Sequence, residues 1–105
     1  MEKKNDYTVI VSEEAATMLE KHTAFLANVS IDAAQRLVDS FKTAAHSLET
    51  MPSRCPWLKS DYIPKNKYRF LVFEKQYMII FQIIDSYVFA DYVIDCRQDY
   101  AWLIK

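Results

Sequence analysis

The spacing of apolar and polar positions changes twice along the chain. Residues 7–11, YTVIV, are β-branched or aromatic, which predicts a strand buried on much of both faces. Residues 13–28 and 31–51 carry apolar side chains at spacings of three and four, which predicts two helices. Residues 68–73, 77–84 and 87–96 are strand-like runs separated by short turns. The predicted order of elements is therefore β-α-α-β-β-β.

The ends of the two predicted helices carry capping signals. Ser12 is the expected N-cap of the first helix, and the two glutamates after it suit the helix dipole. Asn28 is the expected left-handed C-cap, and Ser30 or Asp32 caps the second helix. The expected core-facing positions are Ala15, Ala16, Leu19, Thr23 and Leu26 on the first helix and Ile31, Ala34, Leu37, Val38, Phe41, Ala45 and Leu48 on the second.

These elements predict an α+β fold in which a helical hairpin packs on a small, mainly antiparallel four-stranded sheet. The short helix–helix connection favours the hairpin, and the short turns favour an antiparallel meander of the last three strands. Residues 1–105 are expected to form a single domain, in which the polar residues 1–6 are disordered. The pattern leaves open whether residues 7–11 pair beside the third or the fourth strand.

Glycine is absent from the 105 residues. Phosphate-binding loops of the P-loop, dinucleotide-binding and kinase types are therefore excluded, because each needs glycine where the backbone approaches phosphate. A G-x-S-x-G nucleophile elbow is excluded as well. Turns must be made by other residues, and Asn28, Asn66 and the Asp85–Ser86 pair are the expected ones.

Cysteine and histidine usage gives no sign of a metal or cofactor site. Cys55 and Cys96 are the only cysteines, and His22 and His46 lie at no metal-ligand spacing from them or from each other. We therefore expect no metal, no cofactor and two reduced thiols. No segment has the length of a secretory or membrane-spanning run, so the expectation is a soluble, cytoplasmic protein without a membrane partner.

The formal charge of −1 hides an uneven distribution. Residues 53–75 sum to +4 and the remainder of the chain to −5. Trp57, Tyr62 and Tyr68 are interleaved with the cations of this segment, a composition found in grooves that bind nucleic acid. A solvated loop with extended lysines has the same composition, and both interpretations stay open. The charged residues are the cations Arg54, Lys59, Lys65, Lys67, Arg69 and Lys75 and the acids Asp61 and Glu74.

Four segments resemble, in order, parts of the RelE/ParE superfamily of bacterial type II toxins: YTVIVSEEA, SLETMP, KYRFLVFEKQYMIIFQIID and VIDCRQDY. The similar stretches span about residues 7–100. The resemblance implies a first strand inside the sheet and a toxin held inactive by a cognate antitoxin. It also implies one of two targets, because one branch of the superfamily cleaves mRNA in the ribosomal A site and another poisons DNA gyrase.

The resemblance to the nuclease branch implies roles for particular residues. Arg69 matches a phosphate-contacting cation, Arg97 the arginine after the last strand, and Tyr100 the tyrosine that follows it. Lys65 and Lys67 could add general-acid or electrostatic help. The resulting candidates are Arg69, Arg97, Tyr100 and Lys67 for catalysis, and Lys65, Arg54, Trp57 and Tyr68 for substrate binding.

Two positions depart from the nuclease pattern. Met78 stands where RelE-type nucleases usually carry an arginine, and Asp99 stands where one branch has a proton-transferring histidine. An aspartate, with an ordinary pKa of ~3.9, is a poor acid at neutral pH. The resemblance therefore implies a metal-independent endoribonuclease, but one whose catalytic set is incomplete.

Structural roles compete with each catalytic assignment. Arg69 could be a solvent-facing ion-pair partner, Arg97 could pair with Asp95 or Asp99, and Tyr100 could be a packing residue. Three functions follow: ribosome-dependent mRNA cleavage, inhibition of gyrase through the helical hairpin and the C-terminal end, or a decayed member that only binds its antitoxin. The resemblance further suggests growth inhibition and plasmid stabilization.

Overall fold

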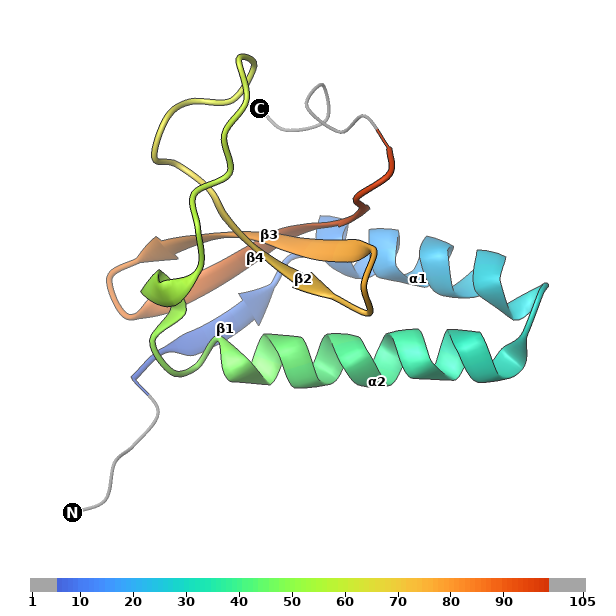
Figure 1. The fold of residues 1–105 in the computed structure, drawn as a ribbon. Coiled ribbons are helices and arrows are strands. Elements are labelled where there is room, and N and C mark those ends of the chain that lie inside the picture. Colours follow the sequence, from blue (N-terminus) through green and yellow to red (C-terminus); the bar gives the residue numbers. More distant parts are fainter. Residues whose placement is uncertain (1–5, 99–105) are drawn as a thin grey trace.

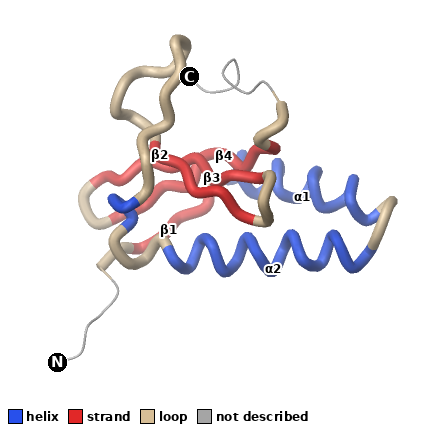
Figure 2. The backbone as a smooth tube through the Cα atoms, in the orientation of Figure 1, coloured by secondary structure: helices blue, strands red, loops and turns tan. Residues whose placement is uncertain are grey.

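In the computed structural model, which describes residues 6–98, a helical hairpin covers one face of a four-stranded sheet (Figures 1 and 2). The predicted order of elements and the α+β class are both confirmed. The elements are β1 (Thr8–Val11), α1 (Glu13–Ala27), α2 (Ile31–Ser47), a short 3-10 helix (Pro52–Arg54), β2 (Arg69–Phe73), β3 (Tyr77–Ile84) and β4 (Tyr87–Asp95). The residues expected to be disordered lie almost entirely outside the described range; Asp6, within it, donates its N–H to the carbonyl of Glu49.

The strand order in the sheet is β1-β4-β3-β2. β2, β3 and β4 form the predicted antiparallel meander, and β1 pairs with β4 in parallel. β1 is thus an edge strand, so the implied position inside the sheet is wrong. The expected burial on both faces is wrong as well: Thr8, Ile10 and Val11 are exposed, because only one flank of β1 has a neighbour.

Both helices begin as the sequence predicts. The hydroxyl oxygen of Ser12 accepts the N–H of Ala15 at 2.9 Å, and that of Ser30 accepts the N–H of Ala33 at 3.1 Å. Ser30, not Asp32, is therefore the N-cap of α2. Asn28 does end α1, but with a right-handed backbone (φ −68°), so the predicted left-handed cap is wrong.

Five residues other than glycine adopt a positive φ, a conformation in which the Cβ atom is crowded. Asn66 and Asp85 are two of the residues expected to make turns, Glu74 and Lys75 lie in the short turn expected between residues 73 and 77, and Met51 was not anticipated. The five are Met51, Asn66, Glu74, Lys75 and Asp85. In the absence of glycine, side chains with a Cβ atom make every left-handed turn in the described part of the chain.

The core between the helices and the sheet is built mainly by α2. Its buried side chains recur at spacings of three and four: Ala34, Leu37, Phe41, Ala44 and, at the C-cap, Leu48. The predicted stripe is wrong at Ile31, which is 76% exposed, because the tip of the hairpin extends past the sheet (Figure 1). It is also wrong at Ala16, which is exposed, and Ala15 is the buried residue of α1.

A second apolar cluster lies on the other face of the sheet. Residues 55–68, which we call the strap, rise on the side of the sheet away from α2 (Figure 1). Leu58 and Ile63 of the strap are buried against Met78, Ile80 and Ile94 of the sheet. The strap therefore supplies the cover that a helix would supply in a three-layer fold.

No helix in the described residues has the length and hydropathy needed to cross a bilayer.

Replacing Leu37 and Ile31 by alanine tests this division of α2. Leu37→Ala removes a side chain with no exposed surface and should lower the free energy of unfolding by about 2–5 kcal/mol. Ile31→Ala changes an exposed side chain and should shift it by less than about 0.5 kcal/mol. Urea unfolding followed by circular dichroism measures both, and equal losses would contradict the observed exposure of the hairpin tip.

Candidate functional site

Arg69, the first residue of β2, holds the start of the strap. Its Nη1 donates to the carbonyl oxygens of Ser53, at 3.1 Å, and Cys55, at 2.6 Å. Its guanidinium carbon also lies 3.8 Å from the centre of the Trp57 ring, a stacked cation–π geometry. Arg69 is half-buried and forms no ion pair with the described residues. Its observed role is to bind backbone carbonyls, which neither sequence-based interpretation included.

Backbone hydrogen bonds fix the strap to the same strand. The N–H of Phe70 donates to the carbonyl of Pro56, and the N–H of Leu58 donates to the carbonyl of Tyr68. Trp57 and Arg69 thereby form an isolated antiparallel bridge along the outer edge of β2. The strap therefore occupies the outer edge of β2 at Arg69 and Phe70, where another strand could otherwise pair.

Tyr68 and Trp57, both predicted to bind substrate, contribute to this attachment. Tyr68 is only 3% exposed, and its ring meets that of Tyr92 edge-on, with centroids 6.1 Å apart. Burial, with smaller effects from Tyr92 and Asp91, raises the pKa of Tyr68 to about 12. Trp57 is half-buried beneath Arg69. Little of either ring is therefore open for stacking on a base.

The lysines and Arg54 have more exposed positions. Arg54 donates to the carbonyl of Met51 at 3.3 Å and to the hydroxyl of Ser47 at 3.1 Å, at the end of α2. Lys67 places its ammonium 5.3 Å from the centre of the Tyr68 ring. Lys65 lines an open concavity of about 570 Å³ on the strap.

Arg97 is held by Asp95 at the end of β4. Its Nε donates to Oδ1 at 3.0 Å and its Nη2 to Oδ2 at 2.6 Å, and its backbone N–H also donates to Oδ1. These bonds lower the pKa of the Asp95 carboxyl and raise that of Arg97. The ring of His22 of α1 lies 5.1 Å from that of Tyr77, and its Nε2 is 3.2 Å from the carbonyl oxygen of Val93 in β4. Of the two acids that the sequence offered, Asp95 is the observed partner.

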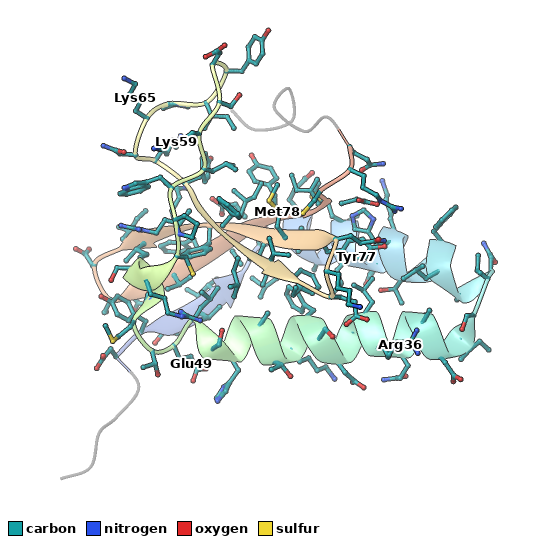
Figure 3. The ribbon with its side chains drawn as sticks, in the orientation of Figure 1. Arg36, Glu49, Lys59, Lys65, Tyr77 and Met78 are labelled. Atoms are coloured by element: carbon teal, nitrogen blue, oxygen red, sulfur yellow. The ribbon has the colours of Figure 1, made fainter. Side chains whose placement is uncertain are left out.

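The register of the sheet separates the two candidate arginines. Arg69 is opposite Phe81 of β3, whereas Asp95, which holds Arg97, is opposite Tyr77. Four residues along a strand span about 13 Å. Between them Met78 is 3% exposed and buried against the strap (Figure 3), so the position that carries an arginine in nucleases faces apolar side chains. Tyr100 and Asp99 lie outside the described residues.

The contact between Glu74 and α2 could not be predicted from the residues around Glu74 in the sequence. Glu74, in the turn between β2 and β3, accepts the hydroxyl of Ser40 at 2.5 Å, and its other oxygen lies 3.7 Å from Nε of Arg36. These residues come from α2, more than thirty positions away. Glu74 therefore ties the hairpin turn to the helix layer.

Residues 6–98 contain no group of three histidine, cysteine or acidic residues that could hold a metal ion, and both cysteines are free.

Two helices on a mixed four-stranded sheet, in the order β-α-α-β-β-β, form the fold that the resemblance to the RelE/ParE superfamily implies. A solved structure entitled "Chromosomal ParDE TA system from P. aeruginosa" has this fold, with a TM-score of 0.70. The similarity covers 88% of this chain and 98% of that one, at 15% sequence identity. The family described as "ParE toxin of type II toxin-antitoxin system, parDE" matches residues 9–100, and the chain belongs to this family. No curated protein matches it in sequence.

Replacing Arg69 should loosen the strap. Hydrogen bonds to a charged group contribute about 1.5–3 kcal/mol, so Arg69→Ala should raise local opening of the strap roughly tenfold or more. Limited trypsin digestion with mass spectrometry should then show faster cleavage after Lys59 and Lys65. Lys42→Ala, which removes an exposed cation of α2, is the control, and unchanged strap cleavage in Arg69→Ala would contradict the structural role.

The Asp95–Arg97 pair should make stability depend on pH in a defined direction. A carboxyl whose pKa is lowered by folding stabilises the fold above its ordinary value of ~3.9. That contribution is lost as the pH falls through the lowered native pKa. Asp95→Asn should therefore differ most from the wild type at neutral pH and converge with it in acid, measured by urea unfolding. Arg97→Ala should give the same trend, and a gap that widens in acid would contradict it.

Proposed function

We propose that this chain is the toxin of a toxin–antitoxin pair and that it arrests growth by binding DNA gyrase without cleaving RNA. The observation that carries this proposal is that Arg69 and Arg97 are both bound by groups of this chain. Arg69 binds two backbone carbonyls and Trp57, and Arg97 is neutralised by the carboxylate of Asp95. Gyrase is the proposed target because it is the one that the resemblance implies for the branch of the superfamily that does not cleave RNA.

Metal-independent RNA cleavage makes demands that this arrangement supports poorly. The reaction needs a base for the 2′-hydroxyl, an acid for the leaving oxygen and cations at the phosphorane. Arg69 and the Asp95 that holds Arg97 lie beside opposite ends of one stretch of β3, next to Phe81 and Tyr77 respectively. Met78, which lies within that stretch, is buried and supplies no charge. Binding to a target protein needs none of these groups, and the fold leaves surface for it.

Exposed apolar side chains at the tip of the helical hairpin support a protein partner. Phe25 is 69% exposed and Val29 77% exposed, and Ile31 follows on the same turn. Exposed apolar groups that gather on one part of a small domain mark interaction surfaces more often than isolated ones do. We assign this tip to contact with the target, because the tip extends past the sheet and can enter a recess (Figure 1).

A cognate antitoxin is the second proposed partner. The family is named for a toxin–antitoxin system, and the similar structure is entitled as one. The exposed side chains Ile10 and Val11 lie on β1, whose outer flank has no neighbouring strand in the described residues. An antitoxin that covers such surface would keep the toxin inactive until it is released.

Gyrase activity in the presence of the purified chain tests the proposed target. Supercoiling of relaxed plasmid should fall as the chain is added. Phe25→Ser combined with Val29→Ser should weaken inhibition roughly tenfold, because two exposed apolar contacts are removed. Lys42→Ser, an exposed change on the outside of α2, is the control and should leave inhibition unchanged.

Mapping of mRNA 5′ ends after induced expression distinguishes the two targets. The proposal predicts growth arrest with no cuts at the ribosomal A site. Cuts at that site, abolished by Lys65→Ala while supercoiling is unaffected, would replace gyrase by the ribosome as the target. Growth without arrest would instead indicate a protein that only binds its antitoxin.

A further inference from the structure

Two lysines of the strap stand without ionic partners in the described part of the chain. Lys59 and Lys65 are exposed, and neither makes a hydrogen bond or ion pair with residues 6–98. Both lie on the strap (Figure 3) and line the concavity of about 570 Å³, together with the buried Leu58 and Ile63. Asp61 is the one acidic side chain in the strap. Because Asp61 also lines this concavity, the strap presents two lysines and one carboxylate at the edge of one hollow, with a net positive charge.

The backbone that carries these lysines is anchored along its length. Arg69 holds its first residues, the bond from Leu58 to Tyr68 closes its base, and Leu58 and Ile63 are buried on the sheet. The positive φ of Asn66 fixes the return of the chain toward β2. A surface that is already ordered loses less entropy on binding, which favours a ligand-binding role.

An exposed aromatic ring lies between the two lysines in sequence. Tyr62 is 80% exposed, and its backbone N–H donates to the hydroxyl of Ser60 at 3.2 Å, which shapes the tip of the strap. An aromatic ring flanked by cations suits a single-stranded nucleic acid, in which phosphates meet the cations and an unpaired base stacks on the ring. An acidic peptide would use the lysines but has no need of the ring.

The charge of the whole chain directs a polyanion to this side. The strap carries three lysines and one aspartate, a charge of +2, and the rest of the chain sums to −3, so a nucleic acid is attracted to the strap. The exposed acids Glu13, Glu14 and Glu20 on α1 contribute to the opposite charge. Attraction of this kind orients the toxin on a target that contains nucleic acid.

We propose that the strap binds single-stranded nucleic acid, with backbone phosphates on Lys59 and Lys65 and an unpaired base on Tyr62. The sugar and the sequence are not selected by this chemistry, so DNA and RNA are both possible ligands. The inference goes beyond the proposed function, because it concerns a second surface, on the opposite side of the sheet from α2, and does not depend on gyrase being the target.

Fluorescence anisotropy with labelled oligonucleotides of about 20 residues tests the proposal with the full chain. Oligo-dT and oligo-rU should bind more tightly than duplex DNA, and comparing the two identifies the preferred sugar. Two phosphate contacts predict a slope of roughly −1.4 for log affinity against log salt between about 50 and 200 mM. Lys59→Ala with Lys65→Ala should remove most of this slope.

Tyr62→Ala separates stacking from charge. It should weaken binding of single strands about fivefold or more and leave the salt slope unchanged. The matched charge control is Lys21→Ala with Lys42→Ala, which removes two exposed lysines from the helices and should have little effect. Protection of Lys59 and Lys65 from acetylation by the oligonucleotide, read by mass spectrometry on the unmodified sequence, gives the same answer without any variant.

Several results would overturn the inference. One is the absence of oligonucleotide binding at about 50 mM salt. Another is an equal loss of affinity in the strap-lysine and helix-lysine double variants. A third is competition by poly-glutamate that is as effective as competition by oligo-dT. The last result would assign the strap to an acidic protein segment. If the strap binds single strands while the chain leaves supercoiling by gyrase unaffected, gyrase is rejected as the target, whereas the proposed binding of nucleic acid by the strap is supported.

Discussion

β3 is buried on both faces, and the rest of the structure depends on satisfying that burial. Ile79 and Phe81 point to the helix layer, whereas Met78 and Ile80 point the other way. Alternate residues of a strand face opposite sides of the sheet. A central strand that is apolar at both odd and even positions must therefore be covered by other segments on both faces. The helical hairpin supplies one cover and the strap supplies the other.

The strap explains why residues that suggest catalysis perform structural work. A loop of fourteen residues without a helix or strand of its own must be held by side chains, and Arg69 does this through two carbonyls and a stacked ring. The planar guanidinium that suits a phosphate suits paired carbonyl acceptors equally well. Lys59 and Lys65 carry charges that the fold does not use, which is why we propose them as ligand contacts.

The candidate site was predictable in composition but not in arrangement. The sequence identified the basic segment, the aromatic residues within it and the pairing options of Arg97. It did not indicate that Tyr68 would be buried against Tyr92 or that Glu74 would bind Ser40, because both contacts join segments distant in the chain. Nor could it show that the register of β3 separates Arg69 from Arg97.

The sequence by itself determined the elements, their order and most of their ends, because periodicity, caps and turn residues act within a few positions. It also determined the uneven charge and, through the absence of glycine, the lack of a glycine-rich phosphate-binding loop. Tertiary structure alone decided that β1 lies at the edge beside β4, that Ile31 is exposed and that Arg69 faces carbonyl oxygens. Each of these depends on which distant segment a residue meets, and local patterns carry no information about that.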